Sequence, residues 1–314
     1  MQKLFFALVA AAVIASIQAQ AADQKIILIA GKVSHGPGDH EFRAGCLLLK
    51  KCLDQVPGVR VEVHTNGWVQ NESAFQDAAA VVLYSDGGGG HPFIQDTRLQ
   101  VIAGLVKNGV GIGCMHFAVE VPKGDAGQAM WDWIGGCYED HYSCNPMWTP
   151  EFNTFPTHPV TRGVKPFALR DEWYFNLRWR PDSKGLTPIL VAKPSDAVRN
   201  GPYVWPAGPY PHIQADKGRD ETMMWAFDRP DGGRGFGWTG GHYHTNWGND
   251  GYRRVVLNAI LWVAKVDVPA NGVESTVTNA DLKLNLDEKG QKKAAAPPPP
   301  AKPEPFVSPT SGAK

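Results

Sequence analysis

Four short apolar runs recur through the first 116 residues, and each ends near a glycine or a polar side chain. Their length and their apolar or alternating pattern predict β-strands at 25–31, 59–66, 79–86 and 109–116. Between them, residues 41–56 and 93–109 place apolar side chains at helical spacing. This β-α-β rhythm predicts a parallel sheet with right-handed crossovers.

The rhythm stops near residue 135. Residues 135–163 are aromatic and have no clear period, which is typical of loops. Beyond them, the pattern predicts three further strands and a closing helix, at 186–193, 221–229, 233–241 and 250–266. The turn Pro-Asp-Gly-Gly joins the last two strands as a hairpin.

The two ends differ in composition from the body of the chain. Lys3, the apolar run 4–17 and the small-x-small site that ends at Ala21 predict a signal peptide over 1–21. We therefore expect a secreted or periplasmic protein, with no integral membrane segment because no second long apolar run follows. Residues 289–314 are proline-rich and poor in large apolar side chains, which predicts a disordered tail.

Charge and cysteine content narrow the functional classes. The 31 basic and 31 acidic residues balance, and no basic block stands out, so nucleic acid is a poor candidate partner. Five cysteines include Cys137 and Cys144, which are spaced to close a short disulfide loop in an oxidising compartment. The alternative is a set of buried free thiols. The sequence has no Cys-x-x-Cys spacing, which disfavours a thiolate zinc site.

Histidines cluster just after the predicted strands. In an open α/β sheet, ligands bind beyond the carboxyl ends of the strands. Six of the ten histidines follow such ends: His35, His40, His91, His116, His242 and His244. A single histidine is usually structural, so the convergence of several from distant parts of the chain is what indicates a site.

Neutral imidazoles are the commonest metal ligands, and three of them with an open position make a catalytic zinc site. We predict that His40, His116 and His242 bind a divalent metal, most plausibly zinc, with His244 as the substitute for His242. Acid–base chemistry without a metal is the alternative, in which the histidines and Asp39 or Glu172 move protons.

Several segments resemble the ThuA-like (trehalose utilisation) family. The resemblance covers about residues 25–266 and rests on the order of the motifs SHGPGDHEF, GCMHFA, GGCYEDH, HPVTRGVKPFALRDEWYF, GRGFGWTGGHYH and NAILWVA. It implies one α/β domain over residues 22–288. The implied fold is a flavodoxin-like, class I glutamine amidotransferase-like parallel sheet flanked by helices, with an aromatic-rich insertion and a C-terminal hairpin.

The resemblance also implies roles for single residues. His116 matches the position of the amidotransferase nucleophile, and Cys114 lies inside the strand, so glutaminase chemistry is disfavoured. Glu172, in the motif Arg-Asp-Glu-Trp-Tyr-Phe, is the implied general base, with an ion pair to Arg170 or Arg178 as the structural alternative.

His141 matches a further family position and is a candidate catalytic residue together with His244. Asp140 and Asp171 are expected to be solvated neighbours of the site.

Aromatic side chains are dense near the strand ends, and indole and phenol rings suit the C–H faces of sugars. The predicted substrate-binding residues are Asp39, Trp173, Tyr174, Tyr243 and Trp247.

Two functions remain open. The first is an exported enzyme of carbohydrate catabolism that acts on small-molecule sugars. The family resemblance points to 3-keto-glycosides, through elimination, hydrolysis or isomerisation. The second is a non-catalytic exported sugar-binding protein.

Overall fold

The computed structural model describes residues 23–290, and its centre is a seven-stranded sheet in the order β11-β12-β13-β4-β3-β1-β2. Five strands are parallel, namely β1 (Gln24–Ala30), β2 (Val59–His64), β3 (Ala78–Tyr84), β4 (Gly111–Met115) and β13 (Arg234–Trp238). Their order, with β13 as the fifth, is the flavodoxin-like order 2-1-3-4-5. The antiparallel strands β12 (Glu221–Asp228) and β11 (Leu186–Ala192) extend one edge. The predicted fold class is confirmed.

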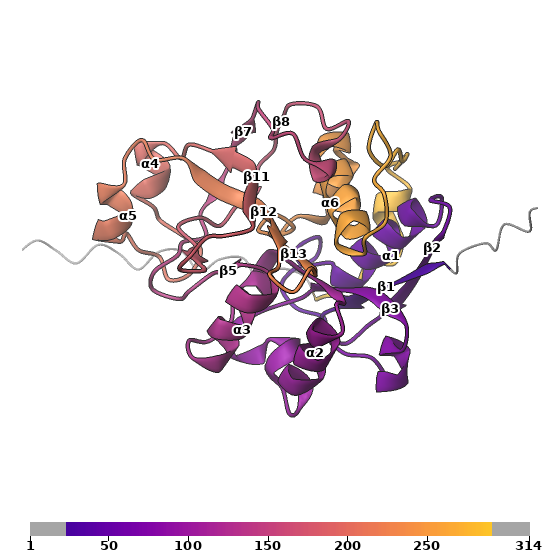
Figure 1. Cartoon of the computed structure of the whole chain (residues 1–314). Coiled ribbons are helices and arrows are strands. Elements are labelled where there is room, and N and C mark those ends of the chain that lie inside the picture. Colours follow the sequence, from indigo (N-terminus) through magenta and orange to yellow (C-terminus); the bar gives the residue numbers. More distant parts are fainter. Residues whose placement is uncertain (1–22, 291–314) are drawn as a thin grey trace, which may run out of the picture.

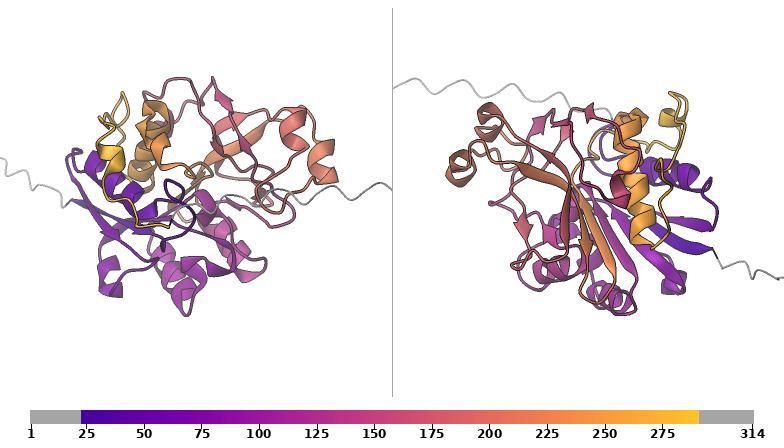
Figure 2. Two further views of the ribbon diagram at one scale, coloured as in Figure 1. Left: turned by 180° about the vertical axis from the view of Figure 1, so that it is seen from behind. Right: turned by 45° about the horizontal axis from the view of Figure 1, so that its top comes forward.

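Helices cover both faces of the sheet, as Figures 1 and 2 show. One face carries α1 (Phe42–Leu53) and α6 (Asp250–Val263), and the other carries α2 (Arg98–Lys107) and α3 (Asp125–Trp133). Successive strand side chains point to opposite faces, so Ile26 and Leu28 join the first core while Ile27 and Ile29 join the second. Because both faces are covered, β1 is an almost continuous apolar run, as expected for a buried parallel strand.

The aromatic insertion contains more structure than its sequence predicts. It folds into three two-stranded ribbons, which pair β5 with β10, β6 with β9, and β7 with β8. Their bounds are Gly136–Cys137, Arg178–Trp179, Met147–Trp148, Asp171–Glu172, Glu151–Phe152 and Phe167–Ala168. Two-residue strands leave no periodic signal, which is why residues 135–163 were predicted as loops and no strand was predicted at 167–179. Strand β9 matters most, because it carries Glu172.

Short helices complete the described chain. The two short α-helices are α4 (Asp196–Arg199) and α5 (Pro211–Ala215), which lie together beyond the β11 edge (Figure 1). The 3-10 helices η1 to η7 are Glu72–Phe75, Gly88–Gly90, Pro92–Ile94, His116–Val119, Pro159–Thr161, His244–Gly248 and Asp281–Lys283.

Several predictions fall at or beyond the limits of the described chain. The predicted signal peptide and residues 291–314 of the predicted tail lie outside it. Lys289, assigned to the tail, is described and its side chain is only 2% exposed.

All five cysteines are buried free thiols, so Cys137 and Cys144 do not form a disulfide. Within residues 23–290, no helix combines the length and apolarity that a membrane span requires.

Candidate metal centre

His116 occupies the first position after β4, where the chain turns sharply into η4. Its φ is +58°, a left-handed value that is uncommon for residues with a side chain and tends to occur at functional sites. Its Nδ1 lies 3.0 Å from the carbonyl oxygen of Thr239. A carbonyl only accepts hydrogen bonds, so Nδ1 carries the proton and Nε2 presents a lone pair to the interior of the site.

His40 comes from the loop between β1 and α1 and also has a left-handed φ, +48°. Its backbone N–H donates to the carbonyl of His242, which fixes the two loops against each other. The His40 Nδ1 lies 2.8 Å from the Oδ1 atom of Asp86, a residue that follows β3. This carboxylate therefore holds the proton on Nδ1 and leaves the His40 Nε2 lone pair facing inward.

His242 follows β13 and has a carboxylate near each ring nitrogen. Its Nδ1 lies 2.8 Å from Glu172 Oε2, and its Nε2 lies 3.7 Å from Asp39 Oδ2. The same Nδ1 atom faces His40, so one ring edge of His242 is directed at both Glu172 and the other imidazoles, while the opposite edge faces Asp39. Asp39, predicted to bind substrate, lies beside His242 in the structure, and its role in substrate binding stays a prediction.

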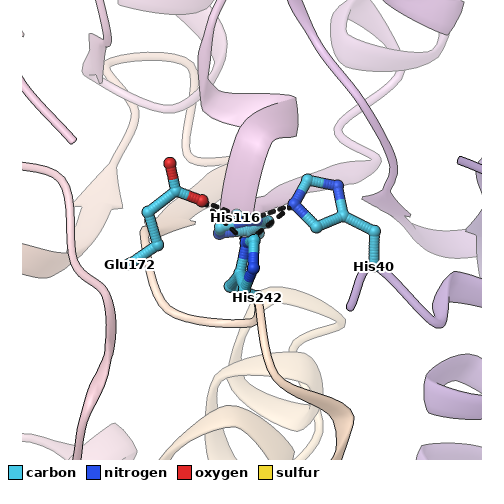
Figure 3. A group of neighbouring side chains, drawn as sticks. All are labelled: His40, His116, Glu172 and His242. Carbon is cyan, nitrogen blue, oxygen red and sulfur yellow. Dashed lines mark hydrogen bonds and ion pairs between the residues drawn. The ribbon is translucent and has the colours of Figure 1, made fainter. Parts of the chain in front are cut away.

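Four side chains from four separate segments meet at one point, as Figure 3 shows. The Nε2 atoms of His40 and His116 are 3.0 Å apart, and His40 Nε2 is 3.1 Å from His242 Nδ1. Glu172 Oε2 lies 3.6 Å from His116 Nε2. Two nitrogens bound to one tetrahedral zinc at about 2.0–2.1 Å lie about 3.3 Å apart. The ligand types and the spacing fit a divalent metal held by three imidazoles with Glu172 beside them, and the lone pairs of His40 and His116 are directed at the same point.

Burial favours the neutral form of His40 and His116, which is the form that binds metal. Loss of solvation, reinforced by the neighbouring histidines, holds the pKa of His40 and of His116 well below the usual value. Burial also raises the pKa of Glu172, an effect opposed by its hydrogen bond from His242. Glu172 is thus a carboxyl group with an increased proton affinity next to the candidate metal position.

Asp171 is not the solvated neighbour that the sequence analysis predicted. It is fully buried, and its carboxylate accepts hydrogen bonds from the backbone N–H groups of Gly241, His242 and Glu172. Adjacent residues of a strand point to opposite sides, so one of two neighbouring acidic residues usually faces solvent. Here both Asp171 and Glu172 are buried. Asp140, by contrast, is exposed as expected.

The cluster opens onto a cavity of about 320 Å³, at the small end of the roughly 300–1,000 Å³ range of ligand pockets. Its walls include two cluster residues and eight others, namely His40, Glu172, His35, Phe117, Glu120, Asp140, Asn145, Tyr174, Val204 and Trp205. Burial, with the nearby Asp140 and Glu172, raises the pKa of Glu120 to about 8. The cavity therefore offers a carboxyl group that keeps its proton at neutral pH.

Comparison with known proteins identifies the family of the chain. Residues 27–263 match the family model ThuA, described as trehalose utilisation. The protein belongs to the ThuA family. No curated protein matches the chain at a significant level. All four residues of the cluster, but not Lys289, lie within the ThuA-matched segment.

Two solved ThuA-like structures are similar in fold. One, from Bacteroides uniformis ATCC 8492, is 15% identical with a TM-score of 0.53 over 78% of this chain and 93% of that one. The other, from Parabacteroides merdae ATCC 43184, is 15% identical with a TM-score of 0.51 over 82% and 94%. The structure of PurLQS from Thermotoga maritima matches at 9% identity with a TM-score of 0.37, over 77% and 98%.

Two predicted catalytic residues of this ThuA protein lie away from the cluster. His141 is on the surface, with a side chain 74% exposed that pairs with Asp140. His244 is buried without a hydrogen-bond partner on either ring nitrogen, and burial lowers its pKa to about 4. Residues in a His-x-His pair share one face only in extended chain, and η6 begins at His244, so its ring turns away.

The predicted aromatic residues also divide. Tyr174 lines the cavity, and its hydroxyl lies 3.3 Å from His116 Nε2. Tyr243 is partly exposed, packs on the ring of His242 and donates its hydroxyl to the sulfur of Met147. Trp173 and Trp247 are instead fully buried in the core with α1 and α6, away from any ligand.

Sequence reasoning missed several residues of the cavity. Glu120 follows the strand and short helix that carry His116, and Asn145 lies in the insertion, so little in the sequence distinguishes either from other polar residues. Trp205 lies in the segment between α4 and α5, where no strand end directs attention to it. None of the motifs that carry the family resemblance includes it either.

Proposed function

We propose that this protein is a metal-dependent enzyme of carbohydrate catabolism that acts on oxidised, 3-keto glycosides. One observation carries the proposal: the outer nitrogens of His40 and His116 are held by acceptors, so that their lone pairs converge 3.0 Å apart on one point beside Glu172. Two facing lone pairs repel unless a cation or a proton lies between them. The family description, trehalose utilisation, supports a sugar as the substrate class.

The residues divide the work as follows. A bound divalent ion would polarise a substrate carbonyl. Glu172 takes the proton from the carbon next to that carbonyl, and Asn145 orients it by donating its side-chain N–H to Glu172 Oε1 over 2.8 Å. Glu120, protonated at neutral pH, can supply a proton to a departing oxygen in the same cavity. This first step is common to elimination, hydrolysis and isomerisation.

A non-catalytic sugar-binding protein is the competing function. A Glu172 held in a structural ion pair with an arginine would support this alternative. In the structure, Arg178 pairs with Glu139, and Arg170 donates to the carbonyl of Met147. Glu172 instead contacts His242 and Asn145 and lines the cavity.

We further propose that the chain is exported, on the strength of its predicted signal sequence.

The test compares two neighbouring histidines. Purified wild type, His242→Ala and His244→Gln would be loaded with zinc, desalted and assayed for bound metal by elemental analysis. We expect about one ion per chain in wild type and in His244→Gln, and little in His242→Ala. Turnover of a 3-keto glucoside should follow the metal content. Wild type without metal would overturn the metal centre, and metal without turnover would favour the binding protein.

A further inference from the structure

Two exposed apolar side chains lie together at the wall of the candidate site. Trp205 is 75% exposed, the highest value among the large apolar side chains of residues 23–290, and its neighbour Val204 is 46% exposed. Both line the cavity that holds Glu172 and His40. An indole so fully in contact with water contributes little to folding through burial, and its face is available to a ligand in the cavity.

The segment that carries this indole is fastened to the catalytic carboxylate. The backbone N–H of Val204 donates to the carbonyl of Asn145 over 3.2 Å, and that of Trp205 donates to the Asn145 side-chain oxygen over 3.1 Å. The amide nitrogen of the same Asn145 side chain donates to Glu172. One amide therefore sets the distance between the indole and the proposed base.

Aromatic rings support the segment from below. Tyr203 is buried and lies 5.6 Å from the ring of Tyr210, which stacks at the same distance on His212. His212 stacks in turn on Tyr142, with ring centroids 5.3 Å apart. These ring contacts restrain the segment that carries the exposed indole, which lowers the entropy cost of holding Trp205 against a ligand.

The charges in the cavity restrict the ligand. Among the residues that line it in the described chain there are three carboxyl groups, Glu120, Asp140 and Glu172, and neither lysine nor arginine. Phosphate groups are usually bound by arginine, lysine or the N-termini of helices. Carboxyl groups instead bind the hydroxyls of an uncharged sugar.

We propose that Trp205 and Val204 form a stacking platform for one ring of an uncharged disaccharide, and that the carboxyl groups around it select against phosphorylated sugars. This inference rests on the proposed function and names its substrate class. The platform lies at the wall and the metal centre at the base, so one sugar ring would stack on the indole while the oxidised ring reaches Glu172.

The experiment measures binding rather than turnover. Calorimetric titration with unoxidised trehalose, which carries no ketone to react, would be run on zinc-loaded wild type, Trp205→Ala and Trp205→Phe. We expect about a tenfold loss of affinity in Trp205→Ala and a smaller loss in Trp205→Phe, which keeps a ring. Leu284→Ala, which removes another exposed apolar side chain (56% exposed) that does not line the cavity, should match wild type.

A second arm tests the charge selectivity. Trehalose 6-phosphate should bind wild type more weakly than trehalose does, and Asp140→Lys should narrow that difference about tenfold. Asp140 is exposed, so the exchange spares the fold. Equal trehalose affinity in wild type and Trp205→Ala would overturn the platform, as would tighter binding of the phosphorylated sugar to wild type.

The two proposals fail separately. Loss of trehalose affinity in Trp205→Ala with no turnover of 3-keto glucosides by wild type would keep the platform and reject the catalytic proposal. Turnover that depends on His242, with a KM that Trp205→Ala leaves unchanged, would reject the platform alone.

Discussion

Four hydrogen-bond donors converge on the carboxylate of Asp171, behind the metal centre. Its Oδ1 accepts from the backbone N–H groups of Glu172 and His242 at 2.9 and 3.0 Å, and its Oδ2 accepts from the N–H of Gly241 and the hydroxyl of Tyr252 at 3.0 and 2.6 Å. Asp171 thereby ties the proposed base to the loop that carries a proposed ligand. It is a positioning residue, because it reaches the site only through its neighbours.

The variant Asp171→Asn tests that role. The amide replaces one acceptor oxygen with an N–H₂ group that faces donors, so buried N–H groups lose their partner at about 1–3 kcal/mol. We expect a lower melting temperature and a weaker zinc affinity. The exposed carboxylate Asp96, which does not line the cavity, gives the control Asp96→Asn, which should change neither quantity. Zinc affinity equal to that of wild type in Asp171→Asn would show that Asp171 supports the fold only.

At the scale of single residues, the sequence predicted which histidines gather better than it predicted the residues that support them. His40, His116 and His242 were identifiable because the carboxyl ends of parallel strands share one edge of a sheet. Burial of single side chains was not, because two-residue ribbons have no period from which to assign an inward face. For this reason Asp171 was expected to be solvated and Trp173 to contact substrate, whereas both side chains are fully buried.

Among the elements, the contact of β12 with β13 depends on a glycine under a tryptophan. A Cβ atom on Gly237 would lie 2.1 Å from the ring of Trp225, which is itself fixed by a 2.6 Å hydrogen bond to the carbonyl of Ile134. The hydrogen bond and the burial of the ring therefore restrict how far it can move away from an added methyl group. Strand β13 leads directly to His242, so its position also sets the position of the metal centre.

We expect Gly237→Ala to destabilise the protein by about 1–3 kcal/mol or more, because an added methyl group overpacks this contact. Gly104 provides the matched control. It lies on the exposed side of α2, where an added Cβ would meet nothing within 4 Å. Gly104→Ala should stabilise by about 0.5–1 kcal/mol through its helix propensity. Chemical denaturation of both variants measures these changes, and equal effects would refute the packing argument.

The elements of the sheet were predictable where their pattern is long. Strands of five to eight residues and the helix α6 lie close to their predicted ranges, because burial of a face imposes a period on many residues. The predicted hairpin of β12 and β13 is confirmed. The helix α3 and the six short strands of the ribbons were missed, because their positions depend on contacts with distant segments.

On the scale of the whole molecule, the C-terminal segment closes over the loop that carries His40. The backbone N–H of Asp287 donates to Glu41 over 2.8 Å, and the Asp287 carboxylate pairs with Arg43. The ammonium of Lys289 lies 3.3 Å from Glu41, with both side chains almost fully buried, and donates to the carbonyl of His40. Asp287 and Lys289 lie beyond the ThuA-matched residues, which end at 263, whereas their partners lie within them.

Composition alone predicts a disordered tail from residue 289 onward, which implies that its removal leaves the stability of the fold unchanged. The contacts of Lys289 give the opposite expectation for that one residue. Removal of one partner from a buried ion pair leaves an uncompensated charge, at a cost of about 3–5 kcal/mol. A composition argument cannot detect this, since a single lysine in a polar tail differs from its neighbours only in where it docks.

Two truncations and one substitution decide the matter. A chain that ends after Gly290 should melt at the same temperature as the full chain and bind zinc equally well. A chain that ends after Glu288 loses the partner of Glu41, so it should melt several degrees lower and bind zinc more weakly because the backbone at His40 loses a donor. Full-length Lys289→Met should reproduce both effects, which separates loss of the ammonium from the new terminal carboxylate near Glu41. If all three proteins melt together with wild type, the segment does not hold the loop, and His40 is positioned by Asp86 and His242 alone.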